Sequence, residues 1–192
     1  MKRMLFLGIA VLLATSAFGQ EFKLGGPVAD FTLQTVKGQN VNFSQLRGDF
    51  TVLMFVATQC PVSNAYNERM NALFRDYSSK GVKFVGINSN STEPAAEVES
   101  HAAKHGFGFA VYKDYNNVVA DRFGATVTPE VFLIDRNGVI AYHGSIDDSQ
   151  NPANIKAQGL KLALDAALAG KPVEKASTKA FGCTIKRART AS

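Results

Sequence analysis

The stretch from Thr51 to Ser63, which reads TVLMFVATQCPVS, limits the possible folds of this chain more than any other part of it. Its apolar residues 52–56 follow one another without alternation and are too few for a helix, so they predict a central strand covered on both faces. Cys60 comes soon after this strand. Pro61 is next, and proline is tolerated in the first turn of a helix because no amide donor is needed there. We therefore expect Cys60 at a strand-to-helix turn, ahead of an amphipathic helix over 63–79.

A cysteine at the amino end of a helix is expected to be reactive. The free backbone amides and the positive end of the helix dipole favour a thiolate, which lowers the pKa of the cysteine and makes its sulfur a nucleophile. The alternative is that Cys60 is a small buried hydrophobic residue, as many cysteines are. The succession of strand, Cys-Pro and helix favours the reactive thiol.

Two sequence blocks, ATQCPVS around Cys60 and VTPEVFLID over 127–135, resemble the thioredoxin-like superfamily. Within it, the chain looks most similar to the redoxin or peroxiredoxin-like branch, the alkyl hydroperoxide reductase and thiol-specific antioxidant proteins. The block PVADFTL, 27–33, adds to the resemblance, which extends to about residue 168. The resemblance implies an α/β fold of the thioredoxin type, with a central mixed sheet flanked by helices.

The resemblance also implies a substrate cleft. In such proteins a cis-proline faces the active cysteine, which here predicts a cis bond between Thr128 and Pro129. The backbone before that proline contacts an extended substrate, a role that falls to Val127 and Thr128. Pro61, beside the cysteine, is expected to line the same cleft.

The periodicity of the remaining chain agrees with this fold class, because strands alternate with helices and the last strands form a hairpin. An amino-terminal hairpin is expected to precede the central strand. Asn137-Gly138, between two apolar runs, is the strongest hairpin signal in the chain. The expected elements are strands at 30–33, 40–43, 82–88, 109–112, 131–135 and 139–142, and helices at 94–105, 116–123 and 153–168.

Residues 1–19 have the pattern of a secretory signal peptide, with two bases, an apolar run and small residues before the expected cut. We therefore expect an exported protein, in a bacterial periplasm, with no stable membrane anchor. Removal of Lys2 and Arg3 reduces the net charge from +5 to +3, too little to indicate a nucleic-acid partner. Residues 20–170 are expected to form one thioredoxin-like domain, and 171–192 a carboxyl-terminal tail.

The tail carries Cys183, the only other cysteine. Most of the tail is Lys, Ala, Thr and Ser, but Phe181 and Ile185 flank this cysteine, so we expect the apolar island to dock on the domain. Two cysteines permit one disulfide. Closing a loop of more than a hundred residues is worth roughly 4–5 kcal/mol in the chain-entropy treatment, so a purely structural Cys60–Cys183 bond is also reasonable.

Ser63 stands where a thioredoxin has its second cysteine. Its hydroxyl can stabilise the Cys60 thiolate but cannot attack a mixed disulfide, so Cys183 is the expected resolving thiol. A second reading is that Ser63 only caps the helix through its side-chain oxygen.

Peroxide reduction is expected to be slow. The peroxiredoxin signature requires Pro and Thr or Ser before its cysteine. Counted back from Cys60, these positions hold Leu53 and Ala57, and counted back from Ser63 they hold Val56 and Cys60. Glu130 lies about where the arginine of that signature is expected. We expect no cofactor and no metal, although His101 and His105 lie one helical turn apart.

Three functions remain, in order of preference. The first is a thiol-disulfide oxidoreductase whose partners are protein or small-molecule thiols and disulfides, with a further thiol partner that donates or accepts electrons. The second is a thiol peroxidase in which Cys60 passes through a sulfenic acid. The third is a redox-inactive binding module with a structural disulfide.

Overall fold

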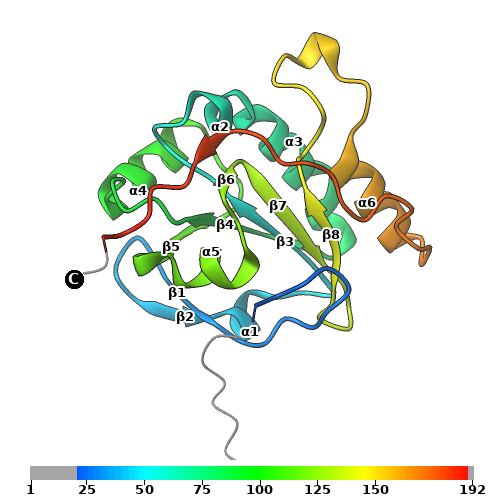
Figure 1. The fold of residues 1–192 in the computed structure, drawn as a ribbon, viewed down its shortest axis with the longest axis horizontal. Coiled ribbons are helices and arrows are strands. Elements are labelled where there is room, and N and C mark those ends of the chain that lie inside the picture. Colours follow the sequence, from blue (N-terminus) through cyan, green and yellow to red (C-terminus); the bar gives the residue numbers. More distant parts are fainter. Residues whose placement is uncertain (1–20, 190–192) are drawn as a thin grey trace, which may run out of the picture.

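The computed structural model describes residues 21–189, so the predicted signal peptide lies outside the described residues. A seven-stranded mixed sheet, in the order β2-β1-β5-β4-β3-β7-β8, forms its centre (Figure 1). A separate two-stranded ribbon pairs β6 with β9. The strands are β1 (Thr32–Gln34), β2 (Asn40–Asn42), β3 (Phe50–Phe55), β4 (Val82–Asn88), β5 (Val111–Lys113), β6 (Val127–Thr128), β7 (Glu130–Ile134), β8 (Ile140–Gly144) and β9 (Cys183–Thr184).

Helices cover both faces of the sheet. Side chains of α3, α4 and α6 join one hydrophobic core, and side chains of α1 and α5 join a second core on the opposite face. The helices are α1 (Phe43–Leu46), α2 (Pro61–Ala65), α3 (Asn67–Tyr77), α4 (Ala95–Lys104), α5 (Val118–Phe123) and α6 (Gly159–Leu168), with 3-10 turns η1 (Ser78–Lys80), η2 (Tyr115–Asn117) and η3 (Pro152–Asn154).

Strand β3 contributes to both cores. Val52 and Met54 belong to the first, and Leu53 and Phe55 to the second. Successive side chains of a strand point to opposite faces, so an unbroken apolar run is what a strand between two cores requires. The strand runs parallel to β4 and antiparallel to β7. The predicted fold class, the central strand and the amino-terminal β1–β2 hairpin are confirmed.

The predicted helix over 63–79 is interrupted at Tyr66. Helix α2 ends at Ala65, and Tyr66 is both its C-cap and the N-cap of α3. The amide of Tyr66 donates to the carbonyl of Ser63 at 3.0 Å. The hydroxyl of Tyr66 donates to buried Asp147 at 2.8 Å. This long-range contact, which periodicity does not predict, is made by the residue between the two helices.

The prediction of a last helix from residue 153 is wrong, because α6 begins only at Gly159. The amide of Asp148 donates to Ala157, and its carboxylate accepts the amide of Lys156. These bonds hold the segment before α6 against the loop after β8. Ile155 therefore lies outside the helix, whereas Leu160 and Leu164 are buried as expected.

The carboxyl-terminal segment, red in Figure 1, crosses one end of the sheet from α6 toward α4. Phe181 packs against the first core, and Ile185, 2% exposed, belongs to the second. The predicted docking of the apolar island is thus confirmed. Between residues 21 and 189 no helix is long and apolar enough to cross a membrane.

Candidate active site

Cys60 lies at the amino end of α2, as its sequence context predicts. It is the N-cap residue, Pro61 occupies the first turn, and the Sγ atom accepts the backbone amide of Ser63 at 3.2 Å. An amide that donates to sulfur stabilises a thiolate more than a thiol. The side chain is only 3% exposed in this structure. The turn therefore offers Cys60 an amide donor, and another part of the chain covers the sulfur.

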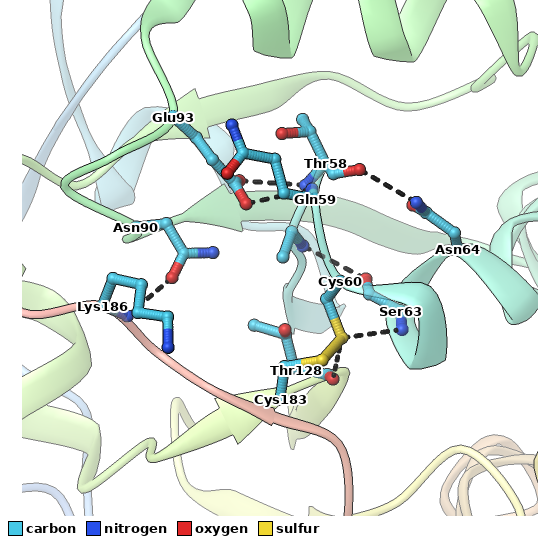
Figure 2. The surroundings of a disulfide bond; sticks show 11 residues. Thr58, Gln59, Cys60, Ser63, Asn64, Asn90, Glu93, Thr128, Cys183 and Lys186 are labelled. Atoms are coloured by element: carbon cyan, nitrogen blue, oxygen red, sulfur yellow. Dashed lines mark hydrogen bonds between the residues drawn. A yellow bond between two sulfur atoms is a disulfide. The ribbon is translucent and has the colours of Figure 1, made fainter.

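The residue that covers it is Cys183. A disulfide joins the two cysteines across a separation of 123 residues, with their Cα atoms 5.8 Å apart (Figure 2). This Cα spacing lies within the usual range for disulfides. The one disulfide that the two cysteines permit is therefore formed within this chain.

The bond between Thr128 and Pro129 is cis, as the resemblance implied. The carbonyl oxygen of Thr128 lies 3.4 Å from the Sγ of Cys60. That contact is not a hydrogen bond here, because a disulfide sulfur carries no hydrogen. The backbone of Val127 and Thr128 is itself already paired with β9.

Ser63 is fully buried and contacts the cysteine through its amide. Its hydroxyl accepts the backbone amide of Ala57 at 3.1 Å, so it fastens the loop before Cys60 to the first turn of α2. No first-turn amide of α2 donates to this hydroxyl, and the N-cap is Cys60. The reading of Ser63 as the capping residue is therefore wrong.

Glu93 holds the same loop through hydrogen bonds to its backbone. Its carboxylate accepts the backbone amides of Thr58 at 2.9 Å and Gln59 at 3.1 Å, and a side-chain bond from Asn88 at 2.5 Å (Figure 2 shows the first two). Glu93 is 3% exposed. Burial alone raises the pKa of Glu93, but the hydrogen bonds from Thr58, Asn88 and Gln59 outweigh it and hold this pKa below its ordinary value.

Lys113 completes a buried polar cluster with Glu93, Asn88 and Asn90. Its Nζ donates to Asn88 Oδ1 at 2.5 Å and to the carbonyls of Glu93 and Asn90 at 2.6 and 3.1 Å. Burial lowers the pKa of Lys113, and the charge of Glu93 opposes that effect. Asn90 Oδ1 also accepts the amide of Lys186 at 2.7 Å. The cluster therefore contacts both the loop before Cys60 and the segment after Cys183.

Sequence analysis missed this cluster, although β5 held a signal for it. Val111 and Lys113 occupy positions i and i+2 of the strand and so share a face. Because Val111 is buried, Lys113 on the same face is also in the interior, where its charged amine needs hydrogen-bond partners. Its partners Asn90 and Glu93 lie in the loop after β4, and Asn88 is the last residue of that strand.

Glu130 is a second buried carboxylate that supports the site. One carboxylate oxygen accepts the amides of Thr126 and Val127 at 2.8 and 3.2 Å, and the other lies 2.6 Å from Nε2 of His143. Glu130, which stands about where a peroxiredoxin has its arginine, thus holds β6 in place through these backbone bonds.

His101 in α4 and His105, the C-cap residue after it, do not form a ligand set. Glu97, on the same helix, accepts hydrogen bonds from Thr58 and Gln59. His101 Nε2 lies 3.3 Å from the side-chain amide of Asn67. Within 21–189 no group of three or more His, Cys, Asp or Glu residues could hold a metal ion.

Comparisons with known proteins agree with this geometry. The sequence model of the AhpC/TSA family matches residues 24–143. A thiol-disulfide oxidoreductase ResA from Geobacillus kaustophilus is 31% identical over 117 residues, which are 61% of this chain and 66% of that protein. The chain thus spans slightly less than two thirds of the length of such curated relatives. They are distant homologues that are named thiol-disulfide oxidoreductases.

Solved structures cover more of the chain. An uncharacterized conserved protein from Geobacillus kaustophilus superposes with a TM-score of 0.82 at 32% identity, over 88% of this chain and 95% of that one. A candidate thiol:disulfide interchange protein DsbE from Chlorobium tepidum superposes with a TM-score of 0.65 at 26% identity, over 77% of this chain and 99% of that one.

Proposed function

The chain belongs to the AhpC/TSA family, and from that premise we propose that it is an exported thiol-disulfide oxidoreductase in which Cys60 is the nucleophile and Cys183 the resolving cysteine. One observation carries the proposal. The Sγ of Cys60 accepts an amide at a helix amino end and is bonded to the only other cysteine of the chain. The distant homology to thiol-disulfide oxidoreductases supports the same reaction class.

The proposed reaction starts from the reduced chain. The Cys60 thiolate attacks one sulfur of a substrate disulfide, forms a mixed disulfide with it and releases the other sulfur as a thiolate. The Cys183 thiolate then attacks the Sγ of Cys60, forms the Cys60–Cys183 bond and releases the second substrate thiolate. Two electrons pass to the substrate, so a thiol partner must reduce the chain for a further cycle. In the reverse direction the same steps oxidise a substrate dithiol.

The supporting residues have proposed roles as well. Ser63 stabilises the thiolate through its amide, and its hydroxyl holds the loop before Cys60 by accepting the amide of Ala57. The substrate cleft is lined by Val127, Thr128, Pro129 and Pro61. We assign export to the signal peptide of residues 1–19, the fold to 20–170, and a resolving arm to 171–192.

A reduction-potential titration tests exchange against a structural staple. Reduced and oxidised chain are equilibrated in thiol buffers of known potential, and the free thiols are alkylated and counted by mass. We expect a midpoint between about −120 and −270 mV, the range of proteins that exchange disulfides. A midpoint below about −300 mV is typical of structural disulfides and contradicts the proposal.

Family membership makes peroxide reduction the second candidate function, and we expect it to be slow. Ala57 stands where peroxiredoxins have the polarising Thr or Ser, and Glu130 contacts the β6 backbone and His143. One missing oxyanion-type donor costs about 10²-fold in rate. The measurement is sulfenic acid formation on Cys60 of the reduced Cys183→Ser variant. Fast, saturable oxidation at micromolar hydrogen peroxide is the outcome that favours the peroxidase.

A further inference from the structure

The tail segment, residues 181–187, covers Cys60 and includes the two-residue strand β9. Cys183 and Thr184 pair antiparallel with Thr128 and Val127, and the amide of Ile185 donates to the carbonyl of Thr126 at 2.9 Å. In a mixed disulfide, a substrate sulfur bonded to Cys60 replaces the sulfur of Cys183. Such a substrate therefore meets the surface that the tail segment now occupies, and the tail's own contacts describe that surface.

Alternate side chains of the tail segment enter this surface. Phe181, Cys183 and Ile185 lie at positions i, i+2 and i+4, so an extended chain directs them to one side. The ring of Phe181 meets Tyr66 edge-on, with centroids 6.1 Å apart, and Ile185 is buried in the second core. Thr184 and Lys186 are exposed. The surface thus has apolar subsites two residues before and two residues after the reactive cysteine.

The position just before the cysteine requires glycine. Gly182 has φ of 156°, and a Cβ atom there would collide with the carbonyl of Thr128. Any side chain at this position has to move the backbone that β9 pairs with. This close approach limits the substrates to those with the smallest residue before their cysteine.

Polar contacts continue beyond the second apolar subsite. The backbone of Lys186 donates to Asn90 Oδ1 and accepts the amide of Ser91 at 2.9 Å. The guanidinium of Arg187 donates to the carbonyl of Ala125 at 2.7 Å and lies 2.9 Å from Asp121. The bound strand is therefore held by its main chain and by a base four residues after the cysteine.

On the basis of the proposed function, we propose that the substrates are extended peptide segments of partner proteins with the pattern apolar-Gly-Cys-X-apolar-X-Arg, and that the tail segment is a built-in copy which competes with them. Main-chain pairing with β6 supplies binding that any strand can use, and the two apolar subsites and the glycine position supply selectivity. The returning tail both resolves the mixed disulfide and displaces the product.

The test uses the full-length, reduced Cys183→Ser chain and synthetic peptides whose cysteine carries a nitrothiobenzoate group. Attack by Cys60 on the peptide sulfur forms the mixed disulfide and releases the coloured nitrothiobenzoate thiolate. The probe is AFGCTIKR, the sequence of residues 180–187. Its control has Thr184 and Ile185 exchanged, which keeps the composition and turns the isoleucine outward. We expect the probe to react about tenfold or more faster, because an apolar side chain loses its burial in the control.

Competition by the tail is tested with a second variant. Adding Ile185→Asp to the Cys183→Ser chain weakens the docked tail, so capture of the probe should accelerate about tenfold or more. An unchanged rate of probe capture would contradict the proposed competition between the tail and the substrate. Equal rates for the probe and its control, with Cys60 modified by both, overturn the sequence pattern but leave the oxidoreductase standing. Failure of Cys60 to react even with a small aromatic disulfide overturns the proposed function together with the inference.

Discussion

The Cys183→Ser variant is expected to hold a substrate sulfur on Cys60 about a hundred times longer than the unaltered chain does, when external thiol is kept at about 10 µM. Ser63 has no thiol with which to release the adduct, and Cys183 is the only other cysteine. A thiol on a tethered tail acts at an effective concentration of roughly 1 mM, which exceeds the external thiol by that factor.

The measurement is the intact mass of acid-quenched samples at increasing times after mixing with a disulfide substrate. Thr184→Ser is the matched control, because it changes the neighbouring exposed residue and leaves both thiols in place. The Cys60→Ser variant should form no adduct at this position. Equal adduct lifetimes in Cys183→Ser and the unaltered chain would remove the resolving role and leave Cys183 as a staple.

The Glu93→Gln substitution is expected to lower the free energy of unfolding of the oxidised chain by roughly 3–5 kcal/mol. The carboxylate accepts two backbone amides, of Thr58 and Gln59, and glutamine has only one side-chain oxygen with which to replace it. Lys113, 2% exposed, also loses the opposing charge. Removing one member of a buried charged group leaves the other uncompensated, which is the costly case.

Urea unfolding with a constant slope gives this difference directly. Glu97→Gln is the matched control, because Glu97 lies on the same side of the loop but is only half-buried, so its loss should cost about 1 kcal/mol or less. A Glu93→Gln chain as stable as the unaltered one would show that the cluster does not hold the loop.

The same carboxylate predicts the pH dependence of stability. The pKa of Glu93 is lower in the folded chain than its ordinary value of 4.5. A carboxylate whose pKa is lowered by folding contributes its full stabilisation at pH values above its pKa in the unfolded chain. This stabilisation is lost as the pH falls through its pKa in the folded chain. The Glu93→Gln chain should therefore lose less stability than the unaltered chain between neutral pH and the acid side of pH 4.5.

Much of the site could be predicted from local sequence. The unbroken run in β3, the cysteine before Pro61 and the apolar island around Cys183 each depend on a few neighbouring residues, whose periodicity and cap chemistry operate over one turn or one strand. The cis bond at Pro129 followed only from the family resemblance, since an isolated X-Pro bond is usually trans.

The start of α6 was beyond such reasoning. Residues 153–158 have ordinary helical composition, but hydrogen bonds to Asp148 take the backbone groups that a helix would use. Local periodicity reports which side chains could share a face and contains no information on a competing partner elsewhere in the chain. Asp147 is likewise buried against Arg69, a residue far from it in the sequence.

The sequence by itself determined that this chain has a cysteine at the strand-to-helix turn after a buried strand, because those features are encoded by neighbouring residues. Only the tertiary structure decided what surrounds the sulfur. Glu93 reaches back 35 residues to Thr58, and Asn90 meets Lys186 across 96 residues. Buried polar groups take whichever partners the fold brings within hydrogen-bond distance, and burial makes those partners obligatory. The same folding step places the tail strand on β6, and so decides that the chain's own carboxyl-terminal segment covers Cys60.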